Sequence, residues 1–116
     1  MTVTIYHNAR CSKSRATLAL LQEKGMTPTI VAYLDTPPDV ATIRDLLNKL
    51  GFSDARQLMR QGEAEYQELH LADPALSQDT LIAAMLTHPR LIERPIVVNN
   101  DQAAIGRPPE NVLAIL

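Results

Sequence analysis

The fold of this chain is most readily inferred from residues 2–34, which read TVTIYHNARCSKSRATLALLQEKGMTPTIVAYL. Residues 2–6 are β-branched or aromatic, which predicts a strand, and residues 7–10 form the loop behind it. Cys11 therefore stands at the point where a strand and its loop lead into the next element.

A helix and a second strand are predicted after this cysteine. Residues 12–24 are mostly helix formers, and Gly25 behind them is typical of a helix C-terminus. Residues 29–34 form a nearly continuous apolar run, which predicts a strand covered on both faces. A helix between two such strands predicts a right-handed βαβ unit.

The middle of the chain carries several helix-start signals. Thr36 as N-cap and Pro37 at the first helical position predict a helix that ends at Gly51. Ser53 and Ser77 are further N-cap candidates. We therefore expect a helical insertion between the βαβ unit and the last third of the chain.

The last third of the chain predicts a hairpin and a short helix. Residues 95–98 and 102–105 are strand-like, and the polar residues 99–101 between them predict a turn. The order βαβ, helical insertion, ββα predicts an α/β fold with a four-stranded mixed sheet flanked by helices, which is the thioredoxin-like plan. We expect residues 1–116 to form a single domain of this kind.

Composition limits the classes of protein to consider. Among 116 residues, 46% are hydrophobic and 21% charged, which is typical of a folded globular domain. A formal net charge of −2 gives no general attraction to nucleic acid. No signal peptide and no membrane-spanning run is recognisable, so we expect a cytoplasmic protein. His70 and His88 lack partners at metal-site spacing, so no metal is expected.

The lone cysteine is the main chemical candidate. Cys11 is expected at a helix N-terminus, where free backbone N–H groups and the helix dipole stabilise a thiolate. Basic side chains lie within four residues of it, namely His7, Arg10, Lys13 and Arg15. For His7 two interpretations are open: it pairs with the thiolate, or it is an ordinary loop histidine.

Ser14 occupies the position of the second cysteine in a Cys-x-x-Cys motif. No local disulfide can form, so a resolving thiol must come from another molecule such as glutathione or a glutaredoxin. Alternatively, Ser14 only supports the first helical turn. Among the arginines, the topology places Arg94 near Cys11, and a guanidinium fork suits a tetrahedral oxyanion. The pattern alone gives Arg60 and Arg107 no such placement.

Several blocks of sequence together resemble one family. YHNxxCxxSR at residues 6–15, LIxRPIVV at 91–98 and RPPE at 107–110 are similar to the glutaredoxin-coupled arsenate reductases, the ArsC family. RxLxR at 56–60 extends the resemblance along practically the whole chain. Arg10, the Cys-Ser-Lys-Ser stretch and an end at residue 116 indicate a short, YfgD-like branch.

The resemblance implies roles for particular residues. Cys11 would attack arsenate, and His7 would assist the thiolate. The oxyanion would be held by Arg60, Arg94 and Arg107, with Asn8, Ser14 and Arg15 also binding substrate. Glutathione as cosubstrate and glutaredoxin as partner would complete the reduction, with no bound cofactor. A cis peptide bond is implied between Arg94 and Pro95.

Two other classes of function remain open. Spx-type regulators share this fold and bind RNA polymerase, but they usually carry Cys-x-x-Cys, which Ser14 removes here. A glutathione-dependent thiol oxidoreductase, or a deglutathionylating enzyme, would use the same residues to bind glutathione carboxylates.

Overall fold

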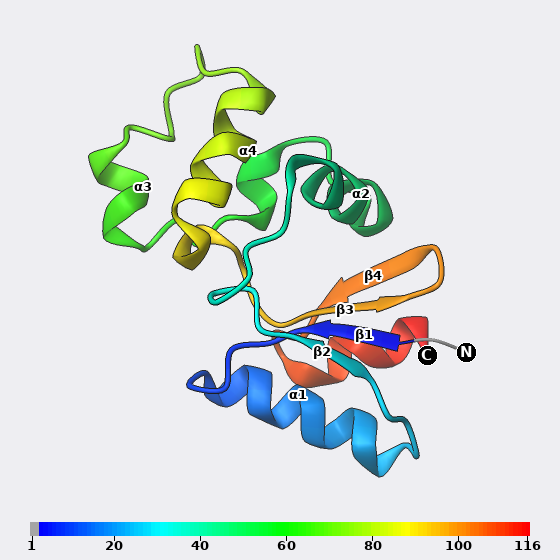
Figure 1. Cartoon of the computed structure of the whole chain (residues 1–116). Helices are drawn as coiled ribbons and strands as arrows, with labels where there is room; N and C mark the ends of the chain where they lie inside the picture. The colour runs from blue at the N-terminus through cyan, green and yellow to red at the C-terminus, as the bar shows by residue number, and fades with distance from the viewer. Residues whose placement is uncertain (1–2) are drawn as a thin grey trace. The chain divides into compact units, whose positions relative to one another are not determined.

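The computed structural model describes residues 3–116, which form two compact units (Figure 1). The first unit contains the chain up to Thr36 and again from Arg94 onward, and the second contains Pro37–Glu93. No helix within residues 3–116 is long and apolar enough to cross a membrane. The expectation of a single domain over the whole chain stays a prediction.

The first unit is built on a four-stranded mixed sheet with the strand order β2-β1-β3-β4. β1 runs parallel to β2 and antiparallel to β3, which in turn pairs antiparallel with β4. The strands are β1 (Val3–Tyr6), β2 (Thr29–Val31), β3 (Ile96–Asn99) and β4 (Gln102–Ile105). The predicted mixed sheet is thereby confirmed, while Thr2 lies outside the described residues.

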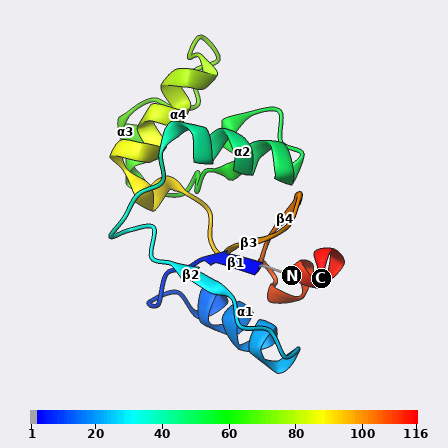
Figure 2. The ribbon, with the colours of Figure 1, turned by 45° about the vertical axis from the view of Figure 1, so that its right-hand side comes forward.

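Two helices pack together on one face of this sheet (Figures 1 and 2). They are α1 (Ser12–Glu23), between β1 and β2, and the 3-10 helix η3 (Pro109–Ile115), after β4. Five buried side chains form the core between them and the sheet: Val3, Ile5, Leu21, Val97 and Val112. Each such aliphatic side chain contributes about 1.5–3 kcal/mol through its burial. This core holds the start of α1 in a defined place at the end of β1.

The prediction of a doubly covered strand over residues 29–34 was wrong. β2 lies at the edge of the sheet and ends at Val31, and Ile30 is 51% exposed. After Val31 the chain turns, with the Tyr33 N–H donating to the Val31 carbonyl at 3.0 Å. An edge strand pairs on one side only, so an apolar run there does not need cover on both faces.

The predicted hairpin is confirmed. β3 and β4 are joined by a two-residue turn in which Asn100 has a positive φ of 56°. The implied cis peptide bond between Arg94 and Pro95 is present, and a second one joins Arg107 to Pro108.

The regular elements of the second unit are helices, apart from an isolated β-bridge between Met59 and Ile92, in agreement with the predicted helical insertion. Its elements are α2 (Val40–Leu50), η1 (Ala55–Leu58), α3 (Ala64–Glu68), α4 (Gln78–Thr87) and η2 (Pro89–Leu91). Its largest fully buried side chains come mostly from α2 and α4 and include Ile43, Leu46, Leu81, Ile82 and Met85. The unit therefore has a core of its own.

Two of the predicted N-caps were misplaced. α2 is capped by Asp39, whose Oδ1 accepts the Thr42 N–H at 2.8 Å, and not by Thr36. The Thr36 hydroxyl is used in the preceding turn instead. η1 is likewise capped by Asp54 and not by Ser53. A carboxylate next to the first free backbone N–H groups is the better placed acceptor in both cases.

Two other predicted helix ends agree with the structure. The Ser77 hydroxyl accepts the Thr80 N–H at 3.1 Å and caps α4, as predicted. Gly51 ends α2 with a φ of 74°, a left-handed conformation that glycine adopts at little cost.

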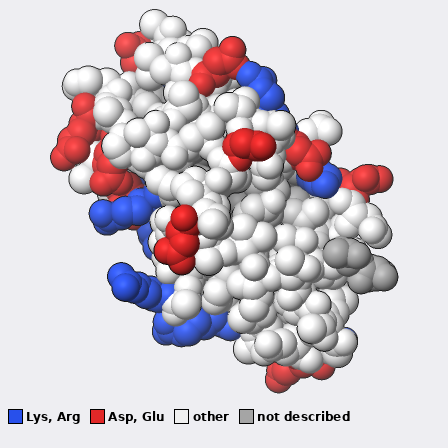
Figure 3. All heavy atoms as spheres, viewed as in Figure 1, with Lys and Arg blue, Asp and Glu red and all other residues white. Residues whose placement is uncertain are grey.

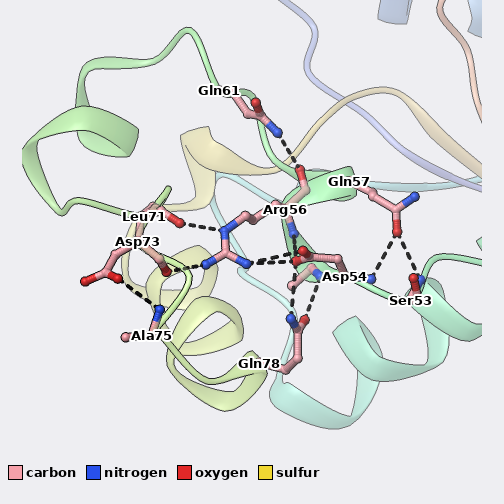
Figure 4. Close-up of polar contacts among 10 residues, drawn as sticks. Ser53, Asp54, Arg56, Gln57, Gln61, Leu71, Asp73, Ala75 and Gln78 are labelled. Carbon is pink, nitrogen blue, oxygen red and sulfur yellow. Dashed lines mark hydrogen bonds and ion pairs between the residues drawn. The ribbon is translucent and has the colours of Figure 1, made fainter.

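Arg56 ties together several segments of the second unit (Figure 4). Its Nε donates to the Leu71 carbonyl at 2.7 Å, and its Nη2 donates to the Asp73 carbonyl at 2.6 Å. Its Nη1 lies 3.2 Å from Oδ2 of Asp54, the N-cap of η1. The Arg56 side chain is only 16% exposed, so these contacts are shielded from water. The planar fork thus joins η1 to the segment that follows α3.

We expect Arg56→Lys to destabilise the protein by about 2 kcal/mol, because an ammonium group cannot replace donors that point to three separate acceptors. Urea unfolding measures the change in the free energy of unfolding. The matched control is Arg44→Lys, since Arg44 pairs with Asp79 at the surface with side chains 53% and 77% exposed. That exchange should leave stability nearly unchanged. Equal effects of the two variants would contradict a structural role for Arg56.

Candidate active site

Cys11 occupies the N-cap position of α1, where the sequence placed it. Its backbone is extended, with φ −95° and ψ 124°, and its carbonyl accepts the first helical hydrogen bond from the Arg15 N–H at 3.0 Å. Its own N–H donates to the Asn8 carbonyl at 3.0 Å, which closes the loop after β1 into a turn. The sulfur therefore stands at the positive end of the helix.

Two arginines meet at this sulfur. Nη1 of Arg107 lies 3.9 Å from Sγ of Cys11 and 3.3 Å from the carbonyl oxygen of Arg94. The Arg94 side chain also hydrogen-bonds to the thiol and acts on it through its charge. Arg94 was placed near Cys11 by topology, whereas Arg107 was a candidate through the family resemblance alone. The available signal for Arg107 was its place two residues after β4, the hairpin strand that pairs with β3.

These neighbours favour the thiolate. Partial burial of Cys11 opposes ionisation, but the hydrogen bonds from the Ser14 and Lys13 backbones and the Arg94 guanidinium outweigh it. Together they hold the pKa of the Cys11 thiol below its usual value of 9.0. The helix N-terminus thus supplies part of the stabilisation, and a side chain from the other end of the sequence supplies the rest.

His7 and Ser14 form a pair beneath the loop. The Ser14 hydroxyl lies 2.6 Å from Nδ1 of His7 and accepts the Asn8 N–H at 3.0 Å. Ser14 is fully buried. Burial of His7, and secondly the charge of Arg15, lower the pKa of His7, so its neutral form is favoured at neutral pH. The His7 ring therefore pairs with the Ser14 hydroxyl, which also links the loop to α1.

Positive charge gathers around the start of α1. Figure 3 shows Lys and Arg side chains clustered over this end of the helix. Nη1 of Arg15 donates to the Ala9 carbonyl at 3.0 Å, and Oδ1 of Asn8 accepts the Arg10 N–H at 3.0 Å. Asn8 and Arg15 therefore shape the loop, while the Arg10 side chain is exposed.

A hollow of about 310 Å³ borders the same loop. Its walls are His7, Asn8, Ala9 and Arg10 on one side and Ala32, Leu34 and Asp35 on the other. It opens at the carboxyl ends of the parallel strands β1 and β2, which is a common place for ligands in α/β proteins.

Arg60 belongs to the other unit, Pro37–Glu93. There its Nη1 lies 2.6 Å from Oε1 of Glu63, and its Nε lies 3.6 Å from Oε1 of Glu93. Its role in holding an oxyanion stays a prediction.

The lowered thiol pKa has a direct kinetic consequence. We expect the rate of Cys11 alkylation by iodoacetamide to rise with pH around a midpoint below that of a free cysteine, because only the thiolate reacts. In Arg94→Gln the midpoint should shift upward, since a charge and a hydrogen bond that favour the thiolate are lost. Alkylation rates across a pH series measure the midpoint in the wild type and in the variant. An identical midpoint in the wild type and in Arg94→Gln would contradict the assigned cause.

Known proteins with similar sequences and structures support this assignment. "Uncharacterized protein YfgD" of Escherichia coli K12 is 61% identical over 114 residues, covering 98% of this chain and 96% of the relative. "Arsenate reductase" of Haemophilus influenzae is 52% identical over 116 residues, covering 100% of both chains. The solved structure of arsenate reductase from Vibrio cholerae has a TM-score of 0.98 and 55% identity, covering 100% of this chain and 98% of that chain.

The fold and the position of the cysteine together define the class of protein. The protein has a thioredoxin-like sheet with a single cysteine at the N-terminus of its first helix. Residues 6–115 match the ArsC family. The chain belongs to the ArsC family, as its motifs indicated.

Proposed function

We propose that this protein reduces arsenate to arsenite, with Cys11 as nucleophile and with glutathione and glutaredoxin as the source of electrons. Relatives at 52% identity over the whole chain are named arsenate reductase, which supports the substrate. The observation that carries the proposal is the meeting of Arg94 and Arg107 at the Cys11 sulfur, with Nη1 of Arg107 at 3.9 Å. A thiolate beside fixed guanidinium groups suits attack on a tetrahedral oxyanion.

The first step is a displacement at arsenic. The Cys11 thiolate attacks As(V), an S–As bond forms, and one arsenate oxygen leaves as water after protonation. Arg94 and Arg107 offset the negative charge that the oxyanion brings to the thiolate. Arg60 is proposed as a third donor through the family motif. Asn8, Ser14 and Arg15 hold the loop and the helix start, and the neutral His7 positions the Ser14 hydroxyl.

The second step transfers two electrons to arsenic. The glutathione thiolate attacks the Cys11 sulfur, an S–S bond forms, and the S–As pair stays on arsenic, which leaves as arsenite. Because Ser14 stands where a resolving cysteine would be needed, the mixed disulfide requires an external thiol. A glutaredoxin thiolate then removes the glutathione and restores Cys11. The hollow lined by His7 and Asp35 offers room for a small thiol beside this loop. These reductants place the reaction in the cytoplasm.

The test is arsenate-dependent oxidation of NADPH, coupled through glutathione reductase, glutathione and glutaredoxin. We expect turnover that requires arsenate, glutathione and glutaredoxin together. Turnover without glutaredoxin would contradict the proposed partner and leave arsenate reduction intact. No turnover with arsenate, together with turnover of a glutathionylated peptide, would contradict arsenate as the substrate.

A further inference from the structure

A very close contact involves the chain neighbours of Arg94 and Arg107. Gly106 follows β4, and its N–H donates to the Pro95 carbonyl at 2.9 Å. A Cβ atom at Gly106 would lie 2.4 Å from Oγ1 of Thr17 and 2.8 Å from Cγ of Pro95. Both distances are too short for any real side chain, so only glycine allows the three segments to approach this closely.

The Thr17 side chain, which faces Gly106, is held in one conformation. Thr17 lies in α1 and is fully buried. Its hydroxyl donates to the Lys13 carbonyl at 2.8 Å, one turn earlier in the helix. A β-branched side chain in a helix has few rotamers, and this hydrogen bond selects one of them. Thr17 therefore cannot swing aside to make room for a larger residue at position 106.

Each partner in this contact is adjacent to a residue at the thiol. Gly106 directly precedes Arg107, and Pro95 directly follows Arg94. Thr17 lies on the helix whose first backbone N–H groups, including that of Lys13, lower the pKa of the Cys11 thiol. We propose that the Thr17–Gly106–Pro95 contact sets Arg94 and Arg107 against Cys11, with Thr17 and Gly106 as positioning residues. This inference rests on the role of the two arginines at the sulfur and is independent of the substrate.

The test uses Gly106→Ala, with the thiol pKa of Cys11 as readout, measured by alkylation rate against pH. The added methyl group must push the hairpin end away from α1, so Arg94 moves away from the sulfur. We expect the thiol pKa to rise by about one unit, which means roughly tenfold less thiolate at a pH below the midpoint. The matched control is Gly62→Ala, because a Cβ at Gly62 meets nothing within 4 Å. A folded Gly106→Ala with the wild-type thiol pKa would overturn the proposal.

A second substitution that relieves the clash distinguishes a positioning role of this contact from a general loss of stability. Thr17→Ala removes both atoms that a residue 106 methyl would meet on Thr17, while the close approach to Cγ of Pro95 remains, so the double variant Thr17→Ala with Gly106→Ala should regain part of the wild-type thiol pKa. Thr17→Val replaces Oγ1 by a methyl group of similar size, so two γ atoms still face Gly106 and the pKa should stay close to that of the wild type, whereas Thr17→Ala alone should raise it. If Gly106→Ala does not fold, the two variants Thr17→Ala and Thr17→Val test the proposal instead. Equal thiol pKa values in Thr17→Ala and the wild type would overturn it. None of these measurements uses arsenate, so the thiol pKa values can be interpreted even if the protein does not turn over arsenate.

Discussion

Cys11→Ser is expected to lose arsenate-dependent NADPH oxidation by at least about 10³-fold, because the nucleophile is removed outright. A serine hydroxyl does not ionise near neutral pH, and a serine oxygen cannot form the mixed disulfide whose formation leaves the electron pair on arsenic. The stabilising contacts from Arg94 and from the start of α1 would then have no thiolate to act on. The steady-state rate of the coupled assay measures the loss.

The same substitution provides its own control for folding. Cys11 is the N-cap of α1, and serine is a favoured residue at this position because its hydroxyl oxygen accepts the same backbone N–H groups. Thermal unfolding of Cys11→Ser should therefore show an unchanged or raised Tm. An inactive variant with a wild-type or higher Tm would assign the loss to chemistry. A Cys11→Ser protein that still reduces arsenate at a substantial rate would contradict the proposed nucleophile.

Arg107→Ala is expected to lower kcat/KM for arsenate by about 10²–10³-fold, the usual cost of removing one preorganised donor from a developing negative charge. Nη1 of Arg107 lies between the Cys11 sulfur and the Arg94 carbonyl, at 3.9 Å and 3.3 Å. Its loss removes a charge at the site of attack and a contact that links the two arginine segments. Arg107→Lys should recover part of the activity, because the charge remains while the planar fork is lost.

Arg10→Gln is the matched control for this arginine. Arg10 directly precedes Cys11 in the chain, but its side chain is exposed, and it is the Arg10 backbone N–H that donates to Oδ1 of Asn8. Screening by water leaves such a charge little effect, so kcat/KM should stay close to that of the wild type. Comparable losses in Arg10→Gln and Arg107→Ala would show that general positive charge, and not the placed guanidinium, supports the reaction.

Local signals were sufficient for most of the fold. The hairpin, α1 and the capping of α4 by Ser77 follow from strand propensity, helix propensity and cap chemistry over a few residues. The position of Cys11 at a helix mouth follows from the same local signals. The N-caps at Asp39 and Asp54 were missed because several acceptors stand within three residues of each helix start, and local preference alone does not choose between them.

What the sequence determined by itself is the order of elements, the mixed four-stranded sheet, the cysteine at the start of α1 and, through its motifs, the ArsC family. Only the tertiary structure decided that β2 is a short edge strand, that Arg107 reaches the sulfur and that Ser14 is the partner of His7. It also decided the contact of Gly106 with Thr17, 89 positions apart. Such features depend on which segments meet after folding, and neither periodicity nor propensity carries that information.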